Sequence, residues 1–179
     1  ICIGIPIGIA MARSNKIQTL ILPILDVMQT IPSFVYLIPV VMLLGIGKVP
    51  GLIAVCIYAI PPIVRLTNLG IRLVDKDILE AAESFGANYW QKLFGVQIPL
   101  ALPTIFAGVN QTIMMSLAMV VIASLVSAPG LGVLVLRGIR NLELGVGLIA
   151  GLGIVLLAVI LDRVSKAAIA RVSSDQTFK

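Results

Sequence analysis

A run of 44 residues without a charged side chain, residues 93–136, is the feature that most constrains what this chain can fold into. One bilayer-spanning helix needs about 20 apolar residues, so this run exceeds one span and must turn within itself. Residues 127–132 contain a proline and two glycines, which suit a turn. We therefore predict a spanning helix over 102–126, followed by a short re-entrant or interfacial helix that ends near residues 137–143.

Composition indicates an integral membrane protein. Hydrophobic residues make up 59% of the chain and charged residues 12%, and the mean hydropathy is +1.12. A soluble domain is roughly half apolar and about a quarter charged. The net charge of +5 comes from basic residues set between apolar runs, which is a topology signal rather than a nucleic-acid footprint. Histidine is absent, and Cys2 and Cys56 lie apart in apolar runs, so neither metal spacing nor a disulfide framework is present.

The remaining apolar segments predict further spans, about five in all. They are residues 1–12, 17–47, 52–73 and 144–161. The first is too short to span and is interpreted as the end of a longer helix, so we expect upstream sequence to be missing. The second contains three prolines and predicts a kinked helix. Gly4 with Gly8, and Gly147 with Gly151, form small-xxx-small pairs suited to close helix packing.

One charged stretch, residues 75–103, separates two of these apolar regions. It holds or adjoins seven charged residues: Arg72, Asp75, Lys76, Asp77, Glu80, Glu83 and Lys92. Asp77 can cap a helix, and Glu80 three residues later completes a pattern like a capping box. Gly86 interrupts this helix, and Asn88 can cap a second one. The pattern predicts two short helices with a break between them.

The apolar residues of this stretch favour one helical face, and its prolines favour boundaries. Spacings of four, three and four place the following residues on one face: Ile78, Ala82, Phe85 and Tyr89. Pro99 is expected to stop helical hydrogen bonding, and Pro103 to lie in the first turn of the next helix. An amphipathic helix lying on a membrane is the plain structural interpretation of the stretch.

The distribution of lysine and arginine predicts the orientation. With alternating spans, nine basic residues fall on one side, namely Arg13, Lys16, Arg72, Lys76, Lys92, Arg163, Lys166, Arg171 and Lys179. Three fall on the other, namely Lys48, Arg137 and Arg140. Cytoplasmic loops carry the excess of basic residues. The charged stretch and the C-terminus are therefore predicted to be cytoplasmic.

The charged stretch also resembles a known signature. Glu80-Ala81-Ala82, then Gly86, then Val96-Gln97-Ile98-Pro99 is similar to the EAA motif of ABC importer permeases, whose usual ending is I-x-L-P. Residues 26–39, 61–67, 108–112 and 161–163 are similar to the glycine betaine/proline betaine uptake permeases. The resemblance covers nearly the whole chain, and the motif lies on the loop between two spans where that family has it.

The resemblance implies an all-α, polytopic fold, the transmembrane domain of a type I ABC importer. This domain would cover residues 1–172, with a coupling loop at 75–99 and a polar tail at 173–179. It also implies a multi-pass protein of the bacterial inner membrane, with two ATPase subunits, a second permease copy and an extracytoplasmic substrate-binding protein or fused receptor domain as partners. No cofactor is expected in the chain itself. ATP would be bound by the partner subunits, since the chain has no G-x-x-x-x-G-K-[ST] phosphate loop.

The resemblance to the EAA motif implies that six residues couple the chain to its ATPase: Glu80, Ala81, Ala82, Glu83, Gly86 and Pro99. The family places the first short helix in a groove of the ATPase. The small side chains at Ala81, Ala82 and Gly86 allow close approach, and Glu80 and Glu83 could pair with basic residues of the partner.

Other polar residues have both a functional and a structural interpretation. Asn110, Gln111, Thr112 and Ser116 could line the translocation path or could hydrogen-bond neighbouring helices. Ser124 and Ser127 continue this segment. Arg137 and Arg140 could dock the receptor or gate the pathway, with Glu143 beside them, or could anchor the chain at the interface. Asp26 is either a functional charge in the membrane or a helix cap at its boundary. The aromatic residues show no cage for a quaternary ammonium ligand and are expected to pack in the core.

Competing functions remain at this stage. An ion-coupled secondary transporter or channel would use intramembrane charges, for which only Asp26 and Arg65 are candidates. A membrane-embedded enzyme is disfavoured by the absence of histidine and of paired intramembrane carboxylates. Within the importer class, choline, carnitine or amino acids are alternative substrates to glycine betaine.

Substitutions in the motif test the coupling assignment. Glu80→Lys reverses a charge and Gly86→Val adds bulk at positions where the family contacts its ATPase, so both variants are expected to insert normally and to abolish uptake. Membrane-fraction immunoblots and uptake assays would measure the two properties separately. Normal uptake by both variants would contradict the assignment.

Overall fold

The computed structural model is built from helices throughout the residues that it describes, 1–126 and 130–177. The helices are α1 (Gly4–Arg13), α2 (Asn15–Thr30), α3 (Ser33–Leu44), α4 (Lys48–Arg72), α5 (Lys76–Ser84), α6 (Tyr89–Lys92), the π-helical segment η1 (Leu93–Gln97), α7 (Ile98–Val126), α8 (Leu131–Arg140) and α9 (Leu144–Thr177). Side chains at 125, 126, 168, 169 and 171–177 are outside the description.

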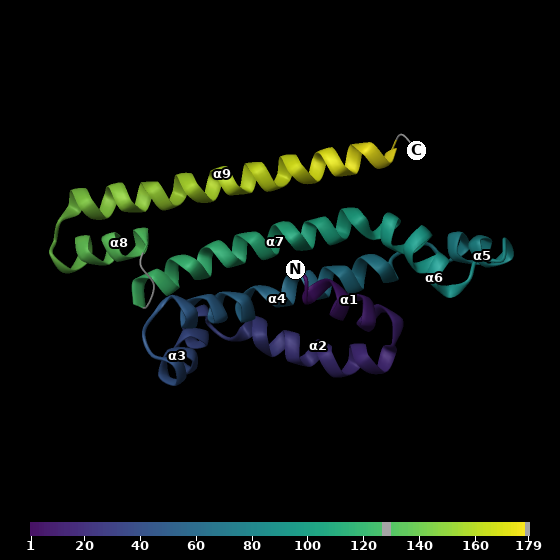
Figure 1. Cartoon of the computed structure of the whole chain (residues 1–179), viewed down its shortest axis with the longest axis horizontal. Coiled ribbons are helices and arrows are strands. Elements are labelled where there is room, and N and C mark those ends of the chain that lie inside the picture. Colours follow the sequence, from purple (N-terminus) through teal and green to yellow (C-terminus); the bar gives the residue numbers. More distant parts are fainter. Residues whose placement is uncertain (127–129, 178–179) are drawn as a thin grey trace.

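Two long antiparallel helices, α4 and α7, form the centre of the fold. Helix α1 packs on α4, while α9 runs alongside α7 (Figure 1). Helices α4 and α9 run in one direction and α7 runs back between them (Figure 1). Helices α5 and α6 protrude at one end, and α8 lies at the other (Figure 1). The chain's C-terminal end and the charged loop therefore point to the same end of the bundle.

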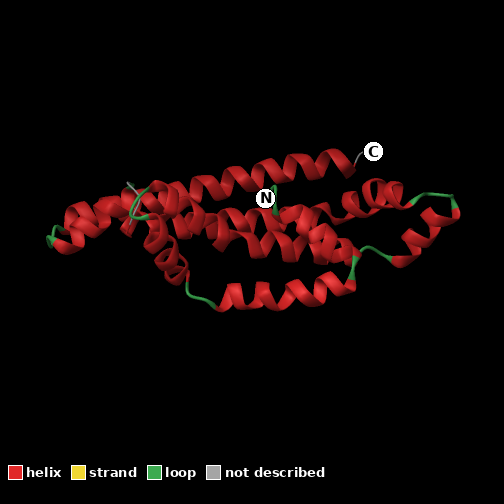
Figure 2. Ribbon diagram, turned by 60° about the horizontal axis from the view of Figure 1, so that its bottom comes forward, coloured by secondary structure: helices red, strands yellow, loops and turns green. Residues whose placement is uncertain are grey.

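Within the part of the chain that the structure describes, three helices are long and apolar enough to cross a membrane: Lys48–Arg72, Tyr89–Ser124 and Leu144–Ala167. The pair α2 and α3 passes the same test together, but it bends by 96° at the break between them. The prediction for residues 17–47 was a kinked helix, whereas the structure has a sharp turn there, shown in Figure 2 as a loop. Pro32 is the N-cap of α3, while Pro23 and Pro39 lie inside helices. The predicted number of about five spans counted α1, which has only 10 residues.

Helix α7 begins earlier than residue 102. Helices α6, η1 and α7 join into one spanning helix of 36 residues. Pro99 was predicted to stop helical hydrogen bonding, and Pro103 to lie in a first turn, but both lie inside the continuous helix. The helix widens before the proline, because the Ile98 N–H donates to the Leu93 carbonyl five residues back. This π turn carries the chain past Pro99, which has no N–H to donate.

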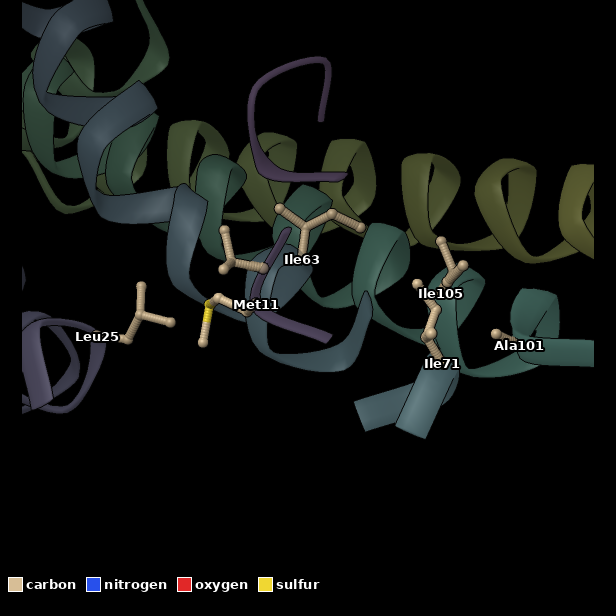
Figure 3. Packing of buried hydrophobic residues seen from close by; sticks show 7 residues of the cluster. Met11, Leu25, Ile63, Ile71, Ala101 and Ile105 are labelled. Carbon is tan, nitrogen blue, oxygen red and sulfur yellow. The ribbon is translucent and has the colours of Figure 1, made fainter. Parts of the chain in front are cut away.

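Two groups of buried side chains hold the bundle together. One joins α1, α2, α4 and α7 through Met11, Leu25, Ile63, Val64, Ile71, Ala101 and Ile105. Figure 3 shows Met11 between Leu25 and Ile63, with Ile71 close to Ala101 and Ile105. The other joins α3, α4 and α7 through Leu37, Ala54, Val55, Met119 and Ala123. Lipid is as apolar as these side chains, so the stabilisation comes from close packing rather than from exclusion of water.

The two predicted small-residue pairs behave differently. A Cβ added at Gly8 would lie 2.6 Å from the Thr67 Cβ, and one at Gly4 would lie 2.3 Å from the Ile63 Cγ2. This pair therefore lets α1 approach α4 closely. Gly147 lies near Gly138 of α8, but a Cβ at Gly151 would meet nothing within 4 Å. In the described chain, only the first pair forms the tight contact that was predicted.

Gly8→Ala is expected to destabilise the fold by about 1–3 kcal/mol, since the new methyl group must displace α1 from α4. Gly151→Ala is the matched control, because the added methyl group meets open space and alanine is the better helix former. Thermal unfolding of the purified chain in detergent would compare the two. Equal losses of stability would contradict the packing described here.

Candidate functional site

The loop between α4 and α7 contains two short helices with a break, as predicted, but its first cap differs. Asp75 caps α5, and its Oδ1 accepts a hydrogen bond of 3.0 Å from the backbone N–H of Asp77. The predicted cap was Asp77. Asp77 instead lies in the first turn, where a carboxylate favours the positive end of the helix dipole.

The break after α5 is made by Gly86. Its φ of +79° lies in the left-handed region that favours glycine. The Gly86 N–H donates to the Glu83 carbonyl at 2.8 Å, and the Ala87 N–H donates to the Ala82 carbonyl at 3.1 Å. These bonds satisfy carbonyls at the helix end. Because α5 ends at Ser84, the predicted single face of Ile78, Ala82, Phe85 and Tyr89 does not form, and the Phe85 ring is 92% exposed.

The second helix begins with the predicted cap. The Asn88 Oδ1 accepts from the Gln91 N–H at 2.9 Å, and the Gln91 Oε1 accepts from the Asn88 N–H at 2.8 Å. This reciprocal pair is a capping box. Leu93 follows, only 1% exposed, and fixes the base of the loop in the bundle.

The six residues carried over to coupling have different environments. Glu83 forms an ion pair with Lys92, which joins α5 to α6 inside the loop. Glu80, Ala81 and Gly86 are exposed, and no ion pair involves Glu80 within the described residues. Ala82 and Pro99 are half-buried. The outward surface of α5 therefore carries charged, small and apolar side chains, with Phe85 just after its end. The exposed residues of the helix are Lys76, Asp77, Ile78, Glu80, Ala81, Glu83 and Ser84.

The polar residues of α7 point in different directions. Asn110 faces α9, where its Oδ1 accepts a hydrogen bond of 2.8 Å from the Ser165 hydroxyl. Gln111 is exposed, and Thr112 is buried with its hydroxyl unpartnered in the described chain. The Ser116 hydroxyl donates to the Thr112 carbonyl at 2.7 Å. These four residues do not share one face.

The serines further along the segment do not extend a polar face in the described structure. The Ser124 hydroxyl donates to the Val121 carbonyl at 2.7 Å, and Ser124 is 6% exposed. Ser127 lies outside the described residues.

The two candidate intramembrane charges lie together. Asp26 of α2 forms an ion pair with Arg65 of α4, and their side chains are 57% and 37% exposed. The Arg65 Nε is buried and has no hydrogen-bond partner among the described residues. Asp26 is thus one half of an ion pair that joins α2 to α4, and Arg65 balances its charge.

The far end of the bundle carries α8 and its arginines. Arg137 lies 3.8 Å from Glu143, measured from Nε to Oε2, while Arg140 is exposed with no ion pair among the described residues. A Cβ added at Gly138 would lie 2.6 Å from the Gly147 Cα, so α8 lies tightly against α9. The basic end of α8 is held on the spans rather than detached from them.

Two aromatic rings meet, without forming a cage. The Tyr36 and Tyr58 rings contact edge to face at a centroid separation of 5.6 Å, and the Tyr36 hydroxyl donates to the Met28 carbonyl. Phe34, in contrast, is 49% exposed. The two tyrosines join α3 to α4, which agrees with the packing role expected for them.

A cavity of about 510 Å³ lies between α4, α7, α8 and α9. Its wall is nearly all apolar, with Lys48 and Ser124 among the few polar residues. None of the four candidate path residues of α7 lines it. The cavity and these polar residues are therefore separate features of the bundle.

Comparison with known proteins connects this geometry to a family. The family model described as "Binding-protein-dependent transport system inner membrane component" matches residues 4–174. The glycine betaine/proline betaine transport system permease protein ProW of Escherichia coli is 58% identical over 167 residues, covering 93% of this chain and 47% of that protein. The glycine betaine/carnitine transport permease protein GbuB of Listeria monocytogenes is 53% identical over 165 residues, covering 92% and 58%.

The chain is also similar to a more distant relative and to a solved structure. The trimethylamine N-oxide transport system permease protein TmoV of Ruegeria pomeroyi is 42% identical over 165 residues, covering 92% of this chain and 25% of that protein. The chain thus spans between a quarter and three fifths of the length of these three relatives. An inward-facing structure of the MetNI methionine ABC transporter matches with a TM-score of 0.79 at 21% identity, covering 98% of this chain and 86% of that one. This likeness confirms the expected all-helical fold, and the family model matches nearly the whole chain.

The Asp26–Arg65 pair is expected to stabilise the contact between α2 and α4. Asp26→Asn and Arg65→Gln should each lower thermal stability in detergent, and the double variant should lose less than the sum by about 0.5–3 kcal/mol, because the two side chains interact directly. Asp26→Asn combined with Arg140→Gln is the control and should be additive. Additive losses in both double variants would show that the pair contributes nothing to stability.

Proposed function

Because the chain belongs to the family of binding-protein-dependent transport system inner membrane components, we propose that it is the membrane-spanning permease subunit of an ATP-driven importer of glycine betaine or related compatible solutes. The observation that carries the proposal is the loop between α4 and α7. It bears the EAA motif and protrudes from the end of the bundle (Figure 1). It is also continuous with a spanning helix of 36 residues.

The proposed mechanism uses this continuity. An ATPase that binds α5 would displace the loop when it binds and hydrolyses ATP. Helix α6 passes through η1 into α7 without a break, and Val74, 8% exposed, fixes the other end of the loop beside α4. Displacement of the loop would therefore tilt the two central helices together. This tilting would alternate the access of a pathway between the two sides of the membrane.

The coupling roles are assigned to the exposed face of α5. Glu80 is an exposed carboxylate that can pair with a basic side chain of the ATPase, and Ala81 and Gly86 permit close approach. Glu83 stabilises the loop internally through Lys92, so its part in coupling is to hold α5 on α6. Ala82 and Pro99 support the loop from its half-buried side.

The assembly we propose contains two permease copies, two ATPase subunits and a receptor outside the membrane, either separate or fused to the chain. The lipid bilayer surrounds it, and the loop and C-terminus face the cytoplasm. Arg137 and Arg140 at the opposite end suit the docking of an acidic receptor surface or the gating of the pathway. The chain itself would catalyse no reaction, because ATP is bound and hydrolysed by its partners.

The substrate class follows from chemistry shared by the relatives' substrates. The names of these relatives include glycine betaine, proline betaine, carnitine and trimethylamine N-oxide. These compounds carry a methylated, positively charged nitrogen together with an anionic oxygen. Asn110, Gln111, Thr112 and Ser116 are proposed as low-affinity polar contacts for such solutes. In the structure Asn110 is hydrogen-bonded to Ser165, and Ser116 to the Thr112 carbonyl. Choline and amino acids are the alternative substrates, and the competition experiment distinguishes them from glycine betaine.

Uptake into vesicles reconstituted with this subunit and its co-purified partners is expected to require ATP on the ATPase side. Radiolabelled glycine betaine would be supplied together with the receptor, and unlabelled betaine, carnitine, choline and amino acids would compete. Competition only by close betaine analogues would support the proposed substrate. ATP-driven uptake of another solute would retain the permease and change its substrate. Uptake driven by an ion gradient without an ATPase would overturn the proposal in favour of a secondary transporter.

A further inference from the structure

A cation–π contact joins the end of α1 to the charged loop. The Arg13 guanidinium carbon lies 4.2 Å from the centroid of the Tyr89 ring and 4.8 Å from that of Trp90. Both distances are within the range in which a cation is attracted to an aromatic face. The sequence places Arg13 and Trp90 far apart, and no motif links them.

The aromatic side of this contact is an ordered group. The Tyr89 and Trp90 rings meet edge to face at 5.7 Å. Trp90 stacks on Phe94 at 5.9 Å, with an angle of 15° between the planes. Phe94 belongs to η1, so the rings extend from α6 into the base of the spanning helix. Movement of α6 therefore carries the whole group with it.

The α1 side of the contact is fixed to the bundle. Arg72, at the end of α4, donates a hydrogen bond of 2.9 Å to the Met11 carbonyl and another of 3.1 Å to the Asn68 side chain. Gly4 and Gly8 bring the rest of α1 against α4. Arg13 thus projects from a helix whose position is set by close packing and by a capped C-terminal turn.

Helix α6 is consequently held from two sides. Lys92 pairs with Glu83 of α5, and Arg13 holds Tyr89 and Trp90 from α1. Arg13 forms no ion pair among the described residues, so the aromatic rings are its recorded side-chain partners. A guanidinium suits this position because it is planar, permanently charged and weakly hydrated.

We propose that Arg13 is a positioning residue of the transport cycle, which clamps α1 onto α6 so that displacement of the loop moves α1 together with α4 and α7. The proposal rests on the proposed function, since it requires an ATPase to displace the loop. The loop's two covalent ends would then act on α4 and α7, while Arg13 would add a third connection. Without that connection, α6 could shift relative to the packed pair of α1 and α4, and ATP hydrolysis would proceed with less transport.

A plain anchoring role is the alternative. Tyrosine, tryptophan and arginine gather where membrane helices meet water. Residues that only anchor the chain there would affect the amount of inserted protein. They would leave the ratio of solute transported to ATP hydrolysed unchanged. This ratio therefore distinguishes the clamp from an interfacial anchor.

The test compares variants in the reconstituted complex of permease, ATPase and receptor, with uptake and ATP hydrolysis measured on the same vesicles. Arg13→Met is expected to lower uptake per ATP by about threefold to tenfold, in line with the strength of a cation–π contact. Arg13→Lys keeps the charge and should recover part of the loss. Trp90→Leu should lower uptake per ATP by a similar factor. Arg13→Met combined with Trp90→Leu should lower it no further than either single substitution, because both remove the same contact. Lys16→Met removes a nearby exposed cation that forms no ion pair among the described residues. This variant is the control and should match the unmodified protein.

A second measurement reports the contact without reference to transport. Trp90 is the one tryptophan of this sequence. Its fluorescence is therefore the difference between the emission of the unmodified complex and that of a complex with Trp90→Phe. Arg13→Met should make that emission more accessible to a soluble quencher, while Lys16→Met should not. Unchanged quenching would overturn the proposed contact.

The outcomes separate the two proposals. Normal uptake per ATP in Arg13→Met, with ATP-driven uptake by the unmodified complex, would overturn the clamp and leave the permease function standing. Reduced amounts of inserted protein with an unchanged ratio would also overturn it, in favour of anchoring. Absence of ATP-driven uptake by the unmodified complex, with increased quenching in Arg13→Met, would overturn the permease function and with it the clamp's role in transport.

Discussion

The close antiparallel contact between α4 and α7 is the constraint on which the rest of the structure depends. A Cβ at Gly70 would lie 2.9 Å from the Thr104 Cβ, and one at Gly108 would lie 3.0 Å from the Leu66 Cβ. Glycine at these two points lets the backbones approach until side chains pack along the full length of both helices. In a bilayer this packing must replace the hydrophobic effect as the source of stability. Helices α1 and α9 then pack on the outside of a pair whose geometry is already set.

The same pair determines where the loop can be and how stiffly it is held. Both ends of the loop emerge from the ends of packed helices, and Val74 and Leu93 are buried there. Within the loop, the Asp75 cap, the Asn88 capping box and the Glu83–Lys92 ion pair fix the two short helices. The exposed face of α5 is therefore presented on a firm base, which suits a surface that must transmit force to the spans.

Local chemistry in the sequence was enough to predict much of this arrangement. The long uncharged run required a turn, and α7 ends at Val126 just before the predicted one. Asn88 and Gly86 have the predicted roles, because caps and left-handed turns depend on few neighbouring atoms. The first cap was harder to predict, since Asp75 and Asp77, two residues apart, can both accept from a free N–H. The effect of the prolines was harder to predict. Pro99 does not end its helix, because the backbone hydrogen bonding changes to a π turn just before it. The pairing of Asp26 with Arg65, 39 residues apart, requires the tertiary fold.

The π turn at the base of α7 has a mechanical consequence. Such a turn contains one residue more than an α-helical turn. If η1 were rewound as α-helix, everything on its loop side would rotate by about 100° about the helix axis and shift by about 1.5 Å along it. A small change in winding at one place would thus reach α5 as a rotation, while the helices on either side of the π turn stayed intact.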